Sequence, residues 1–323
     1  MRLASSAASL ITALLLAPPL AAQADTTVAL RFGWATGTSA RVEVEKVRVR
    51  RTAARVDSIR SRFAHTWKVE AHPEGRRVAW ADFAWVEVPD LPGGDGFLRN
   101  VTQAIHVLPA YIVKPDGALA RVEDLAQART LLGAMFTRVI AANMRDTPPG
   151  ALEVLEQVTP DRVLEALAQQ EWEAQVGMWV GVEVTPGEEI TGTVQEPSPL
   201  NPALAIPTRL AFAMGKRVPC TPGAAEARCV EMRLTSSPEP EPFRRALVDA
   251  VTQMGATAGQ AEAAARDAVK ETRVDAVVEP ATLRPHRVTV VQTLRLVEPT
   301  PGGGAPRPVS QVDRKTYSYT WDK

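Results

Sequence analysis

The chain has two cysteines, Cys220 and Cys229, which lie in the segment PCTPGAAEARC with eight residues between them. A CxxC redox motif has two intervening residues, so this spacing does not fit one. A structural zinc site uses four ligands, and the four histidines of the chain are scattered along the sequence. We therefore predict a Cys220–Cys229 disulfide across a hairpin, and we predict neither a metal site nor a cofactor.

The sequence contains no pattern of nucleophile and base that identifies an enzyme. GxSxG, SxxK and HExxH are all absent. His72, His106 and His286 have no spacing that brings them together, and His65 lies beside Trp67 on the apolar face of a predicted strand, where a core position is favoured over a ligand role. We accordingly predict a protein without catalytic activity.

The N-terminus has the features of a secretory signal peptide. Arg2 precedes the apolar run Leu10 to Leu16, which is too short to span a bilayer, and Ala24 ends a run of small residues typical of a cleavage site. We predict that residues 1–24 are removed. No cysteine directly follows this cleavage site, so we expect no lipid anchor. We also expect no transmembrane segment in the mature chain, and a location in the periplasm or outside the cell.

Net charge gives no argument for a nucleic-acid partner. Lysine plus arginine and aspartate plus glutamate both number 37, and removal of Arg2 leaves 36 basic against 37 acidic residues. The mature chain, residues 25–323, has a length suited to one large domain, which is the organisation that we predict.

Several segments of the first half alternate apolar and polar residues with a period of two, as strands with one buried face do. In the segment ARVEVEKVRVRR, Val42 and Val44 have one phase and Val47 and Val49 have the other. This change of phase predicts a β-bulge. In the second half we predict two strands joined by the disulfide, one before Cys220 and one after Cys229. We predict three more strands near the C-terminus.

Helical periodicity appears in two places between these strands. We predict helices over about 124–144, 159–176, 242–255 and 261–270. Strands grouped in runs with helices between the runs are typical of the α+β class. We predict a large curved antiparallel sheet, a half-barrel, with about four helices packed on its concave face.

This arrangement resembles that of a known superfamily in three parts of the chain. They are the segment HVLPAYIVKPDGALARVED, the two helices predicted after it, and the segment VVEPATLRPHRVTVVQTLRL. The chain resembles the periplasmic lipoprotein carriers, which include the outer-membrane lipoprotein carrier and receptor and the mycobacterial lipid-binding lipoproteins. The resemblance implies a bent sheet capped by helices, with acyl chains held in its concavity.

Tryptophan is common in this chain, with seven residues among only 17 aromatic ones. Core packing explains most of them, but a curved sheet with incomplete cover also leaves room for a ligand. The residues predicted to line such an apolar pocket are Phe32, Trp34, Trp67, Phe136, Phe212 and Trp321. Two hypotheses follow: a binding protein for an apolar or lipid-like ligand, and an envelope protein whose edge strands and loops bind a protein partner.

Overall fold

The structure is a computed structural model, and it describes residues 27–87, 110–126, 130, 161–197, 204–253, 256–298 and 307–322. The predicted signal peptide, and nearly all of the helix predicted over 124–144, lie outside these residues.

The described part of the chain is dominated by strands. In chain order, the elements are β1 (Val28–Ala29), β2 (Ser39–Arg51), β3 (Val56–His72), β4 (Gly75–Glu87), β5 (Tyr111–Val113), β6 (Leu119–Val122), α4 (Asp161–Gln175), the short 3-10 helix η1 (Gly177–Trp179), β7 (Glu183–Val184), β8 (Glu189–Pro197), β9 (Ala205–Val218), β10 (Cys229–Pro238), α5 (Pro240–Gln253), α6 (Ala258–Ala265), β11 (Val269–Glu279), β12 (Arg284–Glu298) and β13 (Arg307–Trp321).

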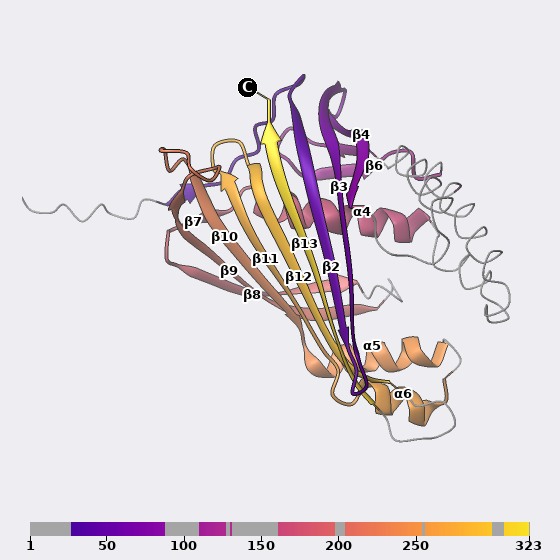
Figure 1. The fold of residues 1–323 in the computed structure, drawn as a ribbon. Helices are drawn as coiled ribbons and strands as arrows, with labels where there is room; N and C mark the ends of the chain where they lie inside the picture. Colours follow the sequence, from indigo (N-terminus) through magenta and orange to yellow (C-terminus); the bar gives the residue numbers. More distant parts are fainter. Residues whose placement is uncertain are drawn as a thin grey trace, which may run out of the picture.

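Eleven strands form one open antiparallel sheet in the order β6-β5-β4-β3-β2-β13-β12-β11-β10-β9-β8 (Figure 1). β1 and β7 pair separately as a two-stranded sheet. In the middle of the large sheet the first long strand, β2, pairs with the last one, β13, so that Arg41 lies opposite Thr320. The prediction of a large antiparallel sheet combined with helices is confirmed.

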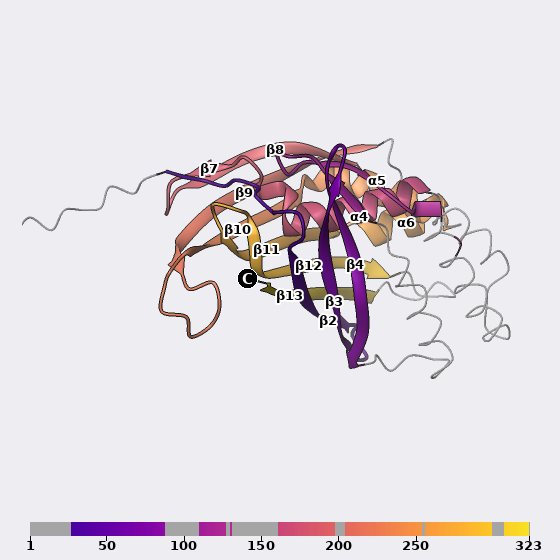
Figure 2. The same ribbon diagram turned by 90° about the horizontal axis from the view of Figure 1, so that it is seen from above.

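Three α-helices occur among the described residues, fewer than the four or so that the sequence predicts. The fourth predicted helix, over 124–144, lies almost entirely outside the described part of the chain. α4 crosses the long strands near one end, whereas α5 and α6 lie at the opposite ends of the strands (Figure 1). Seen from above, all three helices lie on the same side of β12 and β13 (Figure 2).

One face of the sheet therefore carries the helices, and its side chains form the core. Val42 and Val44 of β2 are buried on this face, and Tyr317 and Tyr319 of β13 lie directly opposite them. Trp172, which is fully buried, is the largest core residue that α4 adds. Alternation with a period of two is what places these residues on one face.

The β-bulge predicted in β2 is wrong. The pairing of β2 with β3 and with β13 runs without a register shift along the whole strand. The phase of the apolar residues changes because Lys46, on the helix-bearing face, takes the position where the pattern of Val42 and Val44 would continue. Val47 lies on the opposite face, where it pairs with Arg314.

A tight turn between β5 and β6 helps to shape the core beside α4. Gly117 has a φ of +97° and donates its N–H to the Lys114 carbonyl at 2.9 Å, so the segment KPDGA forms a hairpin turn. A Cβ atom on Gly117 would lie 2.6 Å from the Phe32 side chain. Glycine is therefore required both by the backbone conformation and by the close approach of Phe32.

Candidate functional site

Trp34 lies at the centre of an aromatic cluster between the sheet and α4. Its ring centroid is 5.1 Å from that of Phe32 and 5.5 Å from that of Trp67. The centroids of Trp321 and Trp172 lie 4.9 Å and 5.6 Å away, both in edge-on contacts. The fold thus brings together four of the six residues predicted to line an apolar pocket.

The remaining two predicted pocket residues lie elsewhere. Phe212 packs against Trp179 at 5.5 Å, at another part of the core, and Phe136 lies outside the described residues. Trp34 and Trp67 are only 2% and 1% exposed. Because the rings of the cluster contact one another directly, a ligand would lie beside the cluster and not between its rings.

A half-buried ion pair lies next to this cluster, under α4. Lys315 of β13 donates to Glu171 of α4 at 3.0 Å, and the Tyr317 hydroxyl donates a short hydrogen bond to the other carboxylate oxygen. Burial alone would raise the pKa of Glu171, but the charge of Lys315 and the two hydrogen bonds hold this pKa below its usual value. Glu171 is therefore ionised at neutral pH and neutralises one half-buried cation.

A second half-buried cation, Lys46, lies directly opposite Lys315 in the β2–β13 ladder. Burial, and next the charge of Lys315, lower the pKa of Lys46 to about 8. Among the described residues no carboxylate lies within ion-pair distance of Lys46; its ammonium group stands 5.0 Å from the centre of the Phe63 ring. The two lysines share the single carboxylate of Glu171, so one positive charge here is not neutralised.

His65 of β3 lies next to the region of Lys46. Its ring stacks on Trp80 with 3.9 Å between centroids, and its two nitrogens have no hydrogen-bond partner among the described residues. Burial, and then the charge of Lys46, lower the pKa of His65 to about 3, so the imidazole is neutral. This agrees with the prediction of a core position for His65.

The helix-bearing face continues from Lys46 towards α5 and α6 as a strip of half-buried side chains. It can be followed strand by strand because Phe212 pairs with Leu234, and Leu234 with Val274. The half-buried members of this strip on β9 to β12 include four leucines, Leu210, Leu234, Leu294 and Leu296, and four polar residues, Ser236, Lys270, Thr272 and Gln292. The strip is therefore amphipathic, because polar side chains lie between the leucines on β10 to β12.

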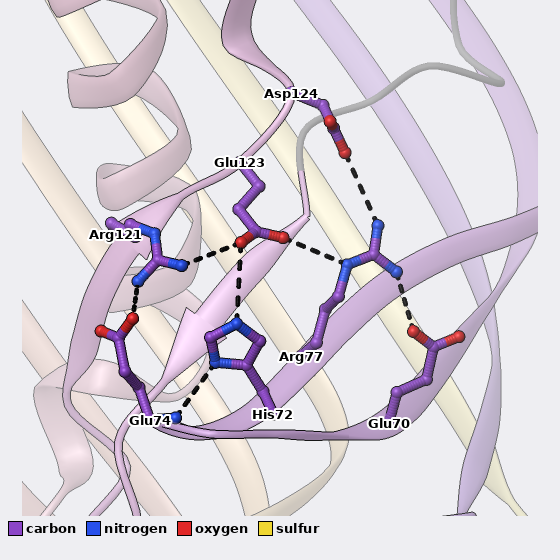
Figure 3. A network of polar contacts seen from close by, with 7 residues as sticks. All are labelled: Glu70, His72, Glu74, Arg77, Arg121, Glu123 and Asp124. Carbon is purple, nitrogen blue, oxygen red and sulfur yellow. Dashed lines mark hydrogen bonds and ion pairs between the residues drawn. The ribbon is translucent and has the colours of Figure 1, made fainter.

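A second cluster of charged residues lies at the other edge of the sheet, around Glu123 (Figure 3). One oxygen of Glu123 accepts from Arg77 of β4 at 3.3 Å, and the other accepts from Arg121 of β6 at 3.0 Å. The Nε2 atom of His72 lies 3.8 Å from Glu123, and its Nδ1 accepts the backbone N–H of Glu74 at 3.2 Å.

The outer members of this network bind the same two arginines. Arg77 also contacts Glu70 at 2.8 Å and Asp124 at 3.5 Å, and Arg121 contacts Glu74 (Figure 3). Each acidic group in the network therefore has an arginine partner, and none of the seven residues carries a hydroxyl or thiol group. The network connects β6 to β3 and β4, which is a structural role.

The predicted disulfide between Cys220 and Cys229 is confirmed, with a Cα–Cα distance of 5.0 Å. The fold adds a residue that the sequence spacing does not reveal, because His286 of β12 lies against the disulfide. The ligand atoms of the two cysteines and His286 are all within 4.8 Å of one another. Val278 of β11 explains this proximity, since it pairs with a neighbour of Cys229 on one side and with a neighbour of His286 on the other.

The face of the sheet opposite the helices carries a hollow of about 850 Å³ over β9 to β13. Arg233 and Arg273 on its wall both bind Asp275, at 2.9 Å and 2.7 Å. The hollow is lined by charged residues and threonines, and it is separated from the aromatic cluster by the thickness of the sheet.

Three residues of interest were not found by sequence reasoning: Lys46, Glu171 and His286. A lysine in the apolar phase of β2 is the signal that could have indicated Lys46, but it was interpreted as a bulge. No signal in the sequence indicates that Glu171 or His286 lies near its partners, because those contacts join distant elements. Among the described residues no hydrogen bond joins a histidine to a serine, threonine or cysteine side chain.

Comparisons with known proteins give no relative from which a role can be transferred. Within the described residues, no helix combines the length and the apolar character needed to cross a membrane. No family model matches the chain, and no curated protein matches it either.

Proposed function

We propose that this chain is an exported, non-enzymatic binding protein that holds an amphipathic, lipid-like ligand with an anionic end between a half-barrel sheet and its helices. The observation that carries the proposal is the unneutralised charge of the half-buried Lys46 at the border between the aromatic cluster and the half-buried strip. A charge that is partly removed from water and has no partner is costly, and such charges are concentrated at functional sites.

The strip supplies the apolar part of the interaction. Leu210, Leu234 and Leu294 are half-buried, so an acyl chain lying on them would remove their remaining surface from water. Burial of about 200 Å² of apolar surface would contribute about 5 kcal/mol, at about 25 cal/mol per Å². The aromatic cluster, which is already packed, would form the wall at the end of this strip.

Lys46 supplies the polar part. Lys315 is paired with Glu171, and Arg48, the next residue of β2 on the same face, is paired with Asp313 at 2.5 Å. A carboxylate or phosphate group of a ligand would give Lys46 the partner that it lacks. Hydrogen bonds to charged groups contribute about 1.5–3 kcal/mol, or roughly tenfold to hundredfold in affinity.

The experiment compares a fluorescent fatty acid with the fatty alcohol of the same chain length. Wild type should bind the acid saturably and more tightly than the alcohol, and Lys46→Met should weaken acid binding about tenfold or more without changing alcohol binding. Lys68→Met is the matched control, because Lys68 is exposed and its nearest carboxylate is 3.9 Å away. Acid binding that is absent, or unchanged in Lys46→Met, would refute the proposal.

A second candidate function, an envelope interaction protein, is favoured by the edge strand β8. This strand ends the described sheet, and Ile190 and Val194 on it are 44% and 40% exposed. Free backbone groups beside exposed β-branched side chains are suited to the addition of a strand from a partner. An Ile190→Lys, Val194→Lys variant should lose a partner recovered by cross-linking in envelope extracts while keeping fatty-acid binding; retention of that partner would exclude this role for β8.

A further inference from the structure

The disulfide and His286 form a cluster whose chemistry is not used by the proposed function. Cys220 follows β9, Cys229 begins β10 and His286 lies in β12, two strands away from β10 in the sheet. The possible metal-ligand atoms of these three residues all lie within 4.8 Å of one another. Two thiolates and an imidazole are a donor set that favours soft metal ions.

His286 is in the state that metal binding requires. Its Nδ1 atom is buried and has no hydrogen-bond partner among the described residues. A neutral imidazole nitrogen without a hydrogen bond keeps a lone pair that a metal ion can accept. An unpaired buried nitrogen in a native structure calls for an explanation, and a ligand is one.

We propose that Cys220, Cys229 and His286 form a Cu(I) site that is closed while the disulfide is intact and opens when the disulfide is reduced. A disulfide sulfur is a poor metal ligand, whereas the thiolates formed on reduction bind soft ions strongly. Cu(I) is favoured over zinc because three protein ligands suit a trigonal soft ion, while structural zinc sites use four.

The redox step balances with a dithiol as reductant. The dithiol gives two electrons and two hydrogens to the Cys220–Cys229 bond and itself becomes a disulfide, leaving two thiols in the protein. The two thiols then lose their protons to water as Cu(I) binds. Cys220 is half-exposed and Cys229 is fully buried, so the incoming thiolate reaches the Cys220 sulfur first.

The test titrates the mature chain with Cu(I) under anaerobic conditions, in competition with a chromophoric Cu(I) chelator. The reduced protein, freed of reductant, should bind one Cu(I) per chain, and the oxidised protein should bind none at this site. Cys220→Ser should abolish the competition, and His286→Asn should weaken it by about tenfold or more. His72→Asn is the control histidine and should bind like wild type.

Two further measurements keep the result interpretable. Tryptophan fluorescence establishes whether the reduced protein and the variants are folded, and X-ray absorption of the loaded protein should show two sulfur ligands and one nitrogen ligand. The proposal is overturned if the reduced protein unfolds, if it does not compete for Cu(I), or if His286→Asn binds as tightly as wild type.

Discussion

Replacing Lys46 by methionine should stabilise the protein near neutral pH. The pKa of Lys46 is lowered from 10.5 to about 8, first by burial and then by the charge of Lys315. Each pH unit of such a difference corresponds to about 1.4 kcal/mol, so a difference of 10.5 − 8 = 2.5 means that the folded state loses about 3 kcal/mol by holding this ammonium group. Methionine keeps the length of the side chain and removes the charge.

The effect has a defined pH window. Because the folded pKa lies below the unfolded one, the unfolded chain binds more protons between pH 8 and 10.5, and the stability of wild type rises with pH in this window. The advantage of Lys46→Met should therefore approach 3 kcal/mol below about pH 8 and fade towards about pH 10.5.

Urea unfolding followed by tryptophan fluorescence measures this difference at several pH values across the window. Lys68→Met serves as the control, since the exposed Lys68 side chain should change the unfolding free energy by no more than about 0.5 kcal/mol at any pH. A Lys46→Met protein that is no more stable than wild type at neutral pH, or whose advantage persists undiminished at high pH, would refute the view that Lys46 is a half-buried, unneutralised cation.

Three other substitutions test the core around this site. Trp172→Ala should lower the unfolding free energy by about 3–5 kcal/mol because it removes a fully buried ring, and a loss below about 1 kcal/mol in urea unfolding would contradict the packing. Glu171→Gln should cost about 1–2 kcal/mol at neutral pH, since the half-exposed Lys315 loses its partner. The folded pKa of Glu171 lies below its usual value, so the deficit should disappear only as the pH falls through that folded pKa, and a pH-independent deficit would count against the ion pair. Cys220→Ser should lower the unfolding free energy of the oxidised protein by about 2–3 kcal/mol, and the two proteins should become equal in reductant.

Much of the fold could be predicted from the sequence because most strands alternate strictly. The β9–β10 hairpin closed by the disulfide, the last three strands, and three of the helices all form where the periodicity indicates them. The helix predicted over 261–270 is α6, which begins three residues earlier, at Ala258, because Thr257 and Gln260 form a capping box, and ends at Ala265, so that residues 269 and 270 belong to β11. The TxxQ pattern of that box was present in the sequence and could have corrected the boundary.

The candidate site could be predicted only in part. Phe32, Trp34, Trp67 and Trp321 were identified because period-two alternation places large apolar side chains on one face, although Phe32 and Trp34 lie in the segment after β1 and not in a strand. The charged centre was missed because a lysine at an inward position was taken for a change in backbone geometry. A departure of this kind from the expected pattern is frequent at functional sites, where local rules are broken for binding.

The pairing of β2 with β13 has a consequence for how the protein is made. Arg41 and Thr320 come from opposite ends of the sequence, yet they are neighbours in the middle of the sheet. Until the C-terminal strand has been synthesised, the two halves of the sheet have no partner along their inner edges, and contacts between such distant residues form slowly. A chain that cannot complete its fold during translation stays unfolded for longer, and the proposed export would require this, because a polypeptide crosses a secretion channel before it folds.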